Sequence, residues 1–283
     1  MKLSDKALLV QLRVSEWTAR KYDRKATEQV AIQNNTASGV GRYNKSLLPM
    51  NDYLADVHSK TRHIRQKFYK NTLPWGLEGM QILPSGNYLQ FVSDFRREKA
   101  EWEYLVSNFF EKYTELKRDA QRILGNLYDE ADYPDVDALR SKFSIDMAVF
   151  PVPNEDFRVQ IADDELSRIQ NEVTQRVQEA QTVAMKEVWG RLFERVEHIS
   201  SKLADPSAIF RDSMLENAKE ICELLPRLNI TDDPNLEQMR QDVEAKLLNN
   251  NPESLRLDPR LREDKAKEAK DIMDKMSVFM GGL

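Results

Sequence analysis

The feature that most constrains this fold is an apolar stripe at helical spacing within residues 163–204. The stripe consists of Leu166, Ile169, Val173, Val177, Ala180, Ala184, Val188, Leu192, Val196, Ile199 and Leu203. Its members lie about 3.7 residues apart on average, which fits a straight α-helix better than the 3.5-residue spacing of a coiled-coil seam. The pattern therefore predicts one nearly straight helix of about 40 residues, roughly 60 Å long.

A second stripe, rich in aromatic residues, predicts another long helix over residues 87–124. It consists of Tyr88, Phe91, Phe95, Trp102, Leu105, Phe109, Tyr113, Leu116 and Ile123. Gly125 follows at the position where a glycine commonly ends a helix. We expect the two long helices to form an antiparallel pair. We also expect self-association into a homo-oligomer, because a chain of 283 residues has little left with which to cover two such stripes.

Short stretches in which apolar and polar residues alternate predict a small β element. Residues 8–14 alternate in this way, and so do residues 143–149 and 157–161 on either side of a proline-containing turn. The last two stretches predict a β-hairpin, which can share a sheet with the first stretch. Residues 80–83 predict a further short strand.

Two basic helices are predicted near the N-terminus. The first starts from a cap at Ser15 or Thr18 and ends near residue 34, and the second covers about 51–70. The loop between them contains Lys45 and two glycines, but it lacks the glycine that directly precedes the lysine in a phosphate-binding P-loop. A nucleotide site is therefore not predicted there.

The dipeptide Asp-Pro occurs three times in the C-terminal third. An N-cap aspartate followed by proline at the first helical position is a helix start signal. The signal predicts helices near residues 206–229, 234–248 and 259–280.

The last of these helices carries a methionine-rich apolar face. This face consists of Ile272, Met273, Met276, Phe279 and Met280. Flexible methionine side chains are common at surfaces that dock on a partner. We predict an oligomer or partner interface here, with docking onto the chain's own bundle as the alternative.

Together these patterns predict a mainly α protein with a minor β part. The expected architecture is an elongated helical protein with two long antiparallel helices, a small β-hairpin or sheet and a C-terminal helical subdomain. Three consecutive segments are predicted as domains, at residues 1–75, 76–162 and 163–283.

Charge is distributed unevenly along the chain. Residues 1–70 contain 14 Lys and Arg against 6 Asp and Glu, a net charge of +8, whereas residues 71–283 carry −13. A basic segment on an acidic body is typical of a nucleic-acid or phosphate surface. It is also compatible with self-association of opposite charges, or with a solvated pair of helices.

The basic N-terminal segment also contains aromatic residues, which can stack on bases while cations contact phosphates. The candidate nucleic-acid-binding residues are Trp17, Arg20, Lys21, Arg24, Lys25, Arg62, Arg65, Lys67 and Lys70. The sequence does not distinguish single-stranded from double-stranded DNA.

Catalytic chemistry has little support in the sequence. One cysteine and three histidines exclude cysteine-based metal sites and leave little for a histidine-based one. Carboxylates gather between Asp129 and Asp137, as in metal-dependent nucleases, but turns and helix starts account for such residues equally well. We therefore expect a protein that is not an enzyme and has no metal or cofactor. No segment resembles a membrane span or a signal peptide, so a cytoplasmic location is expected.

Short motifs along nearly the whole chain carry a resemblance to a known family. They are Ser15–Lys21, Leu73–Gly76, Asp132–Pro134, Pro151–Pro153, Asp156–Val159, Ile209–Asp212, Leu224–Asn229 and Phe279–Gly282. In these motifs the chain resembles an uncharacterised family of helical proteins from phages and integrative elements. Genes of that family often lie near a gene for a MoxR/CobS-like AAA+ ATPase and near recombination genes. The resemblance implies a role in DNA metabolism, or as an ATPase partner, in the cytoplasm of an infected bacterium.

The leading hypothesis is therefore an oligomeric, non-enzymatic accessory protein of phage type that acts in DNA transactions. It would bind nucleic acid, an AAA+ ATPase, or both. The first alternative is an inhibitor that binds a host protein, as phage counter-defence factors do, with its acidic body imitating the charge of DNA. The second alternative is a metal-dependent nuclease that uses the carboxylates between Asp129 and Asp137.

Overall fold

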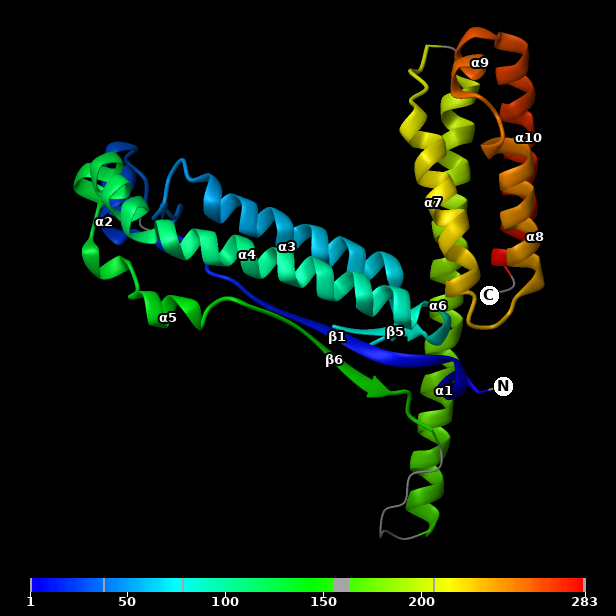
Figure 1. Cartoon of the computed structure of the whole chain (residues 1–283), viewed down its shortest axis with the longest axis horizontal. Coiled ribbons are helices and arrows are strands. Elements are labelled where there is room, and N and C mark those ends of the chain that lie inside the picture. The colour runs from blue at the N-terminus through cyan, green and yellow to red at the C-terminus, as the bar shows by residue number, and fades with distance from the viewer. Residues whose placement is uncertain (1, 38, 78, 155–162, 206, 282–283) are drawn as a thin grey trace. The chain divides into compact units, whose positions relative to one another are not determined.

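The computed structural model describes residues 2–37, 39–77, 79–154, 163–205 and 207–281 (Figure 1). The chain is 70% helical and carries a small antiparallel sheet, which confirms the mainly α prediction. It divides into two compact units. The bundle unit comprises Met1–Gln11, Tyr69–Val92 and Ala148–Leu283, and the paired-helix unit comprises Leu12–Phe68 and Ser93–Met147.

These units differ from the three consecutive domains predicted at residues 1–75, 76–162 and 163–283. Each unit joins stretches of chain that are far apart in sequence, because two strands and two helices each contribute residues to both units. These elements are Ala7–Ser15, Asp52–Asn71, Ser85–Leu124 and Ser144–Pro151. Contacts between distant stretches of chain cannot be read from local composition. The domain boundaries predicted from linkers therefore differ from the boundaries of the compact units.

The bundle unit is built around the long helix α6. Its helices, with a short π-helical turn after α8, are α1 (Leu3–Lys6), α6 (Asp163–Ala204), α7 (Asp212–Leu228), α8 (Pro234–Val243), η3 (Glu244–Leu248), α9 (Pro252–Leu257) and α10 (Pro259–Met280). The predicted stripe of α6 is buried from Ala180 onward, where it packs against α7, α8 and α10. Trp189 and Cys222 are fully buried in this core.

A four-stranded sheet has the order β4-β5-β1-β6, from strands β4 (Leu73–Pro74), β5 (Met80–Pro84), β1 (Ala7–Ser15) and β6 (Ser144–Pro151). Strand β1 pairs antiparallel with β5, so that Leu9 lies opposite Ile82, and both side chains enter the bundle core. The predicted strands over residues 8–14, 80–83 and 143–149 are confirmed. The predicted partner of the last one, at 157–161, lies outside the described residues.

The paired-helix unit contains most of α3 (Asp52–Asn71) and α4 (Ser85–Leu124), which lie side by side (Figure 1). Its smaller elements are β2 (Arg20–Tyr22), α2 (Arg24–Gln33), β3 (Asn44–Ser46), η1 (Gly125–Leu127), η2 (Glu130–Asp132) and α5 (Val136–Arg140). The aromatic stripe of α4 packs on α3, and the indole N–H of Trp102 donates a hydrogen bond to the Thr61 hydroxyl at 2.9 Å. Gly125 has φ +51°, as expected at a helix end.

Both long helices are confirmed, but the partners of their stripes are not those predicted. The stripe of α4 packs on α3 and the smaller elements of its own unit, and the buried part of the α6 stripe packs on α7, α8 and α10. The predicted antiparallel pair is therefore wrong as an account of what covers each stripe. Periodicity shows that a face is buried, but it does not identify the partner.

The Asp-Pro signals were right at two of three positions. Asp233 and Asp258 cap α8 and α10 as predicted. The carboxylate of Asp205 instead accepts hydrogen bonds from the backbone and hydroxyl of Ser207, and the next helix, α7, begins at Asp212. Helix α9 was missed, although Asn251 caps it ahead of a proline in the same way.

Candidate nucleic-acid interface

The first predicted basic helix is a small lobe instead, which we call the basic lobe (residues 20–46). Strands β2 and β3 pair antiparallel, with Tyr22 opposite Asn44, and α2 lies between them in sequence. Asp23 follows β2 directly and caps α2, accepting a hydrogen bond from the backbone of Ala26 at 2.9 Å. The lobe contains six Lys and Arg against two Asp and Glu, a net charge of +4.

The predicted helix start at Ser15 or Thr18 is wrong because the chain turns sharply at Ala19. This residue is buried and has φ +51°, a left-handed conformation that interrupts a right-handed helix. Its carbonyl accepts a hydrogen bond from the backbone of Leu47 at 2.7 Å, which joins the two ends of the lobe. Arg20 and Lys21 therefore lie on a strand, and α2 begins only at Arg24.

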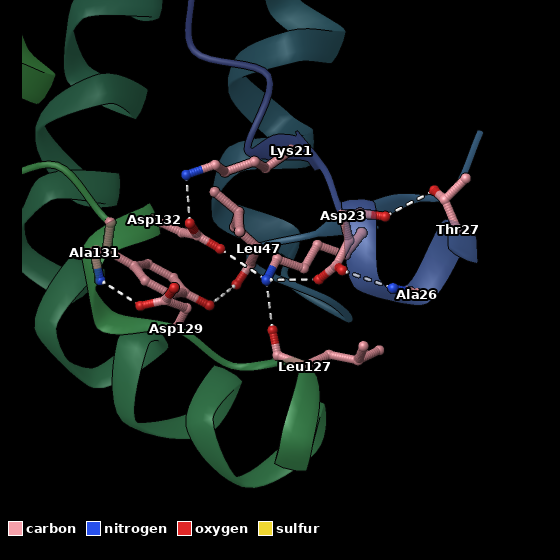
Figure 2. Close-up of polar contacts among 11 residues, drawn as sticks. Lys21, Asp23, Ala26, Thr27, Leu47, Leu127, Asp129, Ala131 and Asp132 are labelled. Atoms are coloured by element: carbon pink, nitrogen blue, oxygen red, sulfur yellow. Dashed lines mark hydrogen bonds and ion pairs between the residues drawn. The ribbon is translucent and has the colours of Figure 1, made fainter. Parts of the chain in front are cut away.

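A buried lysine anchors the lobe to the rest of its unit through partners that include Asp23, Asp132 and Leu127, which Figure 2 shows. The side chain of Lys45 is only 6% exposed, and its ammonium lies 3.1 Å from Asp23 Oδ2 and 2.8 Å from Asp132 Oδ2. It also donates a hydrogen bond to the carbonyl of Leu127 at 2.6 Å. Lys21 pairs with the other carboxylate oxygen of Asp132. The cluster therefore ties both strands of the lobe to the segment that follows α4.

The charges in this cluster hold one another ionised. Burial alone lowers the pKa of Lys45, but its bonds to Asp132 and Asp23 outweigh this, so the pKa lies above its usual value. Burial raises the pKa of Asp132, and Lys21 and Lys45 together bring it below its usual value. Lys45 is consequently held by carboxylates and is not available to a phosphate, in agreement with the absence of a P-loop pattern.

The predicted lobe residues differ in what they contact. Arg20 and Lys25 are exposed, and neither has an ion-pair partner among the described residues. Arg24 pairs with Glu28 on the surface of α2 at 2.8 Å, and Lys21 is held by Asp132.

Trp17 lies just before the basic lobe, and the structure does not place it as a stacking platform. Its ring packs against Phe109 and Tyr113 in the aromatic core, with ring centroids 6.4 Å and 6.0 Å apart. The side chain is only partly exposed. The prediction of Trp17 as a base-contacting residue is therefore corrected.

The predicted cations of α3 also divide into two kinds. Arg62 and Arg65 are exposed and have no ion-pair partner in the described ranges. Lys67 and Lys60 instead converge on Glu98 of α4, with Lys60 Nζ 2.6 Å from Glu98 Oε2. Burial raises the pKa of Glu98, but the effect of the two lysines is larger and lowers the pKa to about 2.

Lys70 is the remaining predicted cation, and it belongs to the bundle unit. Its ammonium pairs there with the carboxylate of Glu220 on α7. The pair is partly exposed to solvent. Lys70 therefore has an ion-pair partner within its own unit, unlike Arg62 and Arg65.

Much of the predicted charge asymmetry is neutralised within one unit. Residues 12–68 carry 11 Lys and Arg against 5 Asp and Glu, but residues 93–147 of the same unit carry 9 against 13. The paired-helix unit therefore has a net charge of +2, and the bundle unit has −7. Of the predicted cations, Arg20, Lys25, Arg62 and Arg65 remain exposed without an ion-pair partner among the described residues.

A groove of about 880 Å³ opens on the basic lobe between α2 and the segment before β3. Exposed tyrosine rings and arginines line it together with aliphatic side chains, among them Tyr22, Arg24, Val30, Val40, Arg42 and Tyr43. The guanidinium carbon of Arg42 lies 5.7 Å from the centroid of the Tyr22 ring, within cation–π range. The groove combines flat apolar surface with positive charge.

The carboxylates considered for a nuclease have other partners. Asp129 and Asp135 cap η2 and α5, Asp132 is bound by two lysines, and Glu130 pairs with Lys117 and the Tyr128 hydroxyl. Among the described residues no group of His, Cys, Asp and Glu is arranged to hold a metal ion.

The methionine-rich face of α10 packs onto the chain's own bundle. Ile272 and Met276 are fully buried, and Met273, Phe279 and Met280 pack against the same core. The Phe279 ring lies 5.6 Å from that of Trp189. The structure thus corrects the predicted oligomer or partner interface and supports the alternative, docking within the chain.

Three groove residues, Tyr22, Arg42 and Tyr43, were not predicted as site residues. Their only local signal is an aromatic residue near a cation on either side of α2, which is common on exposed surfaces. The anchor formed by Lys45 and Asp132 had no local signal, because the two residues are distant in the sequence.

Comparison with models of protein families, with curated proteins and with solved structures finds no match to this chain. The resemblance to a phage and integrative-element family therefore stays a prediction. No helix within the described ranges is long and apolar enough to cross a membrane.

Proposed function

We propose that this chain is a non-enzymatic nucleic-acid-binding protein that acts in DNA transactions. The observation that carries the proposal is that four of the predicted nucleic-acid-binding cations stay exposed after the internal ion pairs are made. Arg20, Lys25, Arg62 and Arg65 all belong to the paired-helix unit, and none has an ion-pair partner among the described residues. Exposed arginines and lysines that are not neutralised are the groups that bind phosphates and release counterions.

The proposal is supported by a distinction between cations that form ion pairs within the unit and cations that do not. Lys21, Lys45, Lys60 and Lys67 are bound to carboxylates and help to fold the unit. The free cations have no such structural task. Arginine is also well suited to phosphate, because its planar fork donates two parallel hydrogen bonds.

The test is binding of a fluorescently labelled 40-nucleotide single strand and its duplex, measured by anisotropy at 50 and 200 mM salt. The variant is Arg62→Glu with Arg65→Glu. Lys67 stays unchanged, because its loss would disturb Glu98. We expect the variant to bind at least roughly tenfold more weakly, with a smaller dependence on salt, because each phosphate contact contributes about 0.9 to the salt slope on duplex DNA.

The matched control is Lys186→Glu with Lys219→Glu, which makes the same change in net charge on exposed positions of the bundle unit. We expect this control to retain most of the binding. Equal loss of affinity in both variants would show that binding depends on net charge alone. Unchanged binding by the Arg62 and Arg65 variant would overturn the assignment of these residues.

A second candidate function is inhibition of a host protein. It is favoured by the net charge of −7 on the bundle unit, which can imitate a nucleic acid. In that case the chain ignores DNA at both salt concentrations and co-purifies with a basic host protein.

A further inference from the structure

We infer that the groove on the basic lobe binds single-stranded nucleic acid, with bases stacked on Tyr22 and Tyr43. This inference rests on the proposed function and names the class of nucleic acid and the residues that select it. It gives a role to the exposed tyrosines of the groove, which phosphate binding by the unpaired cations does not require.

The rings of Tyr22 and Tyr43 are exposed to solvent and are not buried in the core. Tyr22 is 47% exposed and Tyr43 is 39% exposed, and both line the groove. Isolated exposed tyrosines are ordinary on protein surfaces, but two of them on the walls of one hollow offer stacking faces on which bases can lie.

The backbone holds both tyrosines in place. Tyr22 lies in β2, opposite Asn44 of β3. The backbone N–H of Tyr43 donates to the Thr27 hydroxyl at 2.9 Å, and its carbonyl accepts from the backbone of Asp23 at 2.9 Å. The backbone position of each tyrosine is therefore set by the fold of the lobe, which limits the entropy lost when a base is bound.

The charge of the groove matches a phosphate backbone. Arg24 and Arg42 line it, and Glu28 is its one acidic residue among those described, already paired with Arg24. The other carboxylate of the lobe, Asp23, caps α2 and contacts Lys45. The lobe therefore presents no unpaired carboxylate to repel phosphate.

The shape of the groove favours a single strand over a duplex. Its volume of about 880 Å³ is within the range of ligand pockets, roughly 300–1,000 Å³. Its walls include Val30, Ile32 and Val40, which are apolar and exposed. Bases in a duplex are stacked on one another and are not available to such walls, whereas the bases of a single strand can turn into them.

The experiment compares the full chain with the variant Tyr22→Ala with Tyr43→Ala. Three probes are used: a 12-nucleotide oligothymidylate, a duplex of the same length, and an abasic 12-mer that keeps the phosphates but lacks bases. We expect the chain to bind the single strand more tightly than the other two. The variant should lose roughly tenfold or more of the affinity for the single strand and keep its affinity for the abasic strand, because stacking is lost while charge remains.

Two further variants keep the result interpretable. Tyr22→Phe with Tyr43→Phe retains the rings and should bind as the unmodified chain does. Tyr53→Ala with Tyr104→Ala removes two exposed rings of the same unit that do not line the groove, and it should also leave binding unchanged. Thermal unfolding of each variant checks that the lobe remains folded.

The outcomes separate the inference from the proposed function. Equal binding of all three probes, unaffected by loss of the two rings, overturns the stacking site while nucleic-acid binding stands. No binding of any probe at 50 mM salt overturns both. Retention of a protein partner by the groove, abolished in the Tyr22 and Tyr43 variant, likewise overturns the inference.

Discussion

Charged groups are buried in the paired-helix unit, whereas the bundle unit buries neutral ones. Lys45 is 6% exposed and Glu98 is 5% exposed; they are the buried charged residues among those described, and both lie in the paired-helix unit. The buried polar residues of the bundle unit, within the described ranges, are Thr72 and Asn87. The two units therefore differ in how their polar interactions respond to pH and to loss of a charge.

The bundle unit uses arginines in another way, to satisfy the carbonyls at helix ends. Arg191 donates to the carbonyls of Tyr69, Lys70 and Thr72, at and just beyond the end of α3. Arg262 donates to carbonyls at and just after the end of α6, including Leu203 at 3.0 Å. The last carbonyls of a helix lack partners within it, and a guanidinium with five donors can bind several at once.

The difference has a physical consequence. A buried ion pair has paid a desolvation cost, so removal of one member leaves the other uncompensated. A guanidinium that caps carbonyls is always protonated, so its bonds do not change over the ordinary pH range. We therefore expect the paired-helix unit to show the larger responses to charge removal and to acid.

The largest effect is expected for Lys45→Met. The substitution keeps most of the apolar stem but removes the charge that faces Asp132 and Asp23 and the donor to Leu127. We expect the free energy of unfolding to fall by about 4 kcal/mol, because breaking a buried pair leaves a buried carboxylate without its partner. Urea unfolding measures the loss.

Two variants test the cause. Lys25→Met, on the exposed surface of the same lobe, should change the free energy of unfolding by no more than about 0.5 kcal/mol. Lys45→Met combined with Asp132→Leu should recover part of the loss, since replacing both partners removes the uncompensated charge. A Lys45→Met chain as stable as the unmodified one would show that the cluster does not anchor the lobe.

A slightly smaller and pH-dependent effect is expected for Glu98→Gln. The folded chain holds the pKa of Glu98 at about 2, below the usual value of 4.5. The unfolded chain therefore takes up a proton first as the pH falls. The stability that Glu98 provides is present above pH 4.5 and is lost as the pH drops toward 2. The difference amounts to about 3 kcal/mol.

The measurement is the free energy of unfolding of both chains at pH 7, 4 and 3. The gap between the unmodified chain and Glu98→Gln should narrow as the pH falls. Glu111→Gln, at an exposed position of the same helix, serves as the control and should show no such gap. A gap that stays constant from pH 7 to pH 3 would contradict the role given to the two lysines.

The parts of the structure that were predictable from the sequence are those whose signals are local. The long helices α4 and α6 follow from their stripes, and α8 and α10 follow from an aspartate cap and a proline, because these signals act within a few residues. The register of an apolar stripe is local information.

The basic lobe was not predictable in this way. Residues 20–22 have a composition compatible with a helix, but the left-handed turn at Ala19 and pairing with residues 44–46 make them a strand. Asp205 failed as a helix cap for a similar reason: it lies where α6 ends, and Arg262 binds the carbonyls there. The candidate site depends on such distant partners, so the sequence identified its charge but not its shape.

The smallest of the three effects is expected for Arg191→Ala in the bundle unit. The substitution leaves three carbonyls near the end of α3 without their donor, although solvent can reach part of this site. It also removes an ion pair with Glu187 on the surface of α6, which contributes little. We expect a loss of about 1.5 kcal/mol, the lower end of the range for hydrogen bonds to a charged group. Unfolding in urea at pH 7 and at pH 4 should give the same loss, because the guanidinium stays protonated at both.

Two further substitutions identify what the guanidinium contributes. Arg191→Lys should recover only part of the stability, because an ammonium has no planar fork with which to reach three separate carbonyls. Arg195→Ala, one helical turn further along α6, removes an arginine with no ion-pair partner in the described chain and should cost little. If the loss caused by Arg191→Ala depended on pH, as the loss caused by Glu98→Gln is expected to do below pH 4.5, the contrast between an arginine that caps carbonyls and a buried titratable pair would fail.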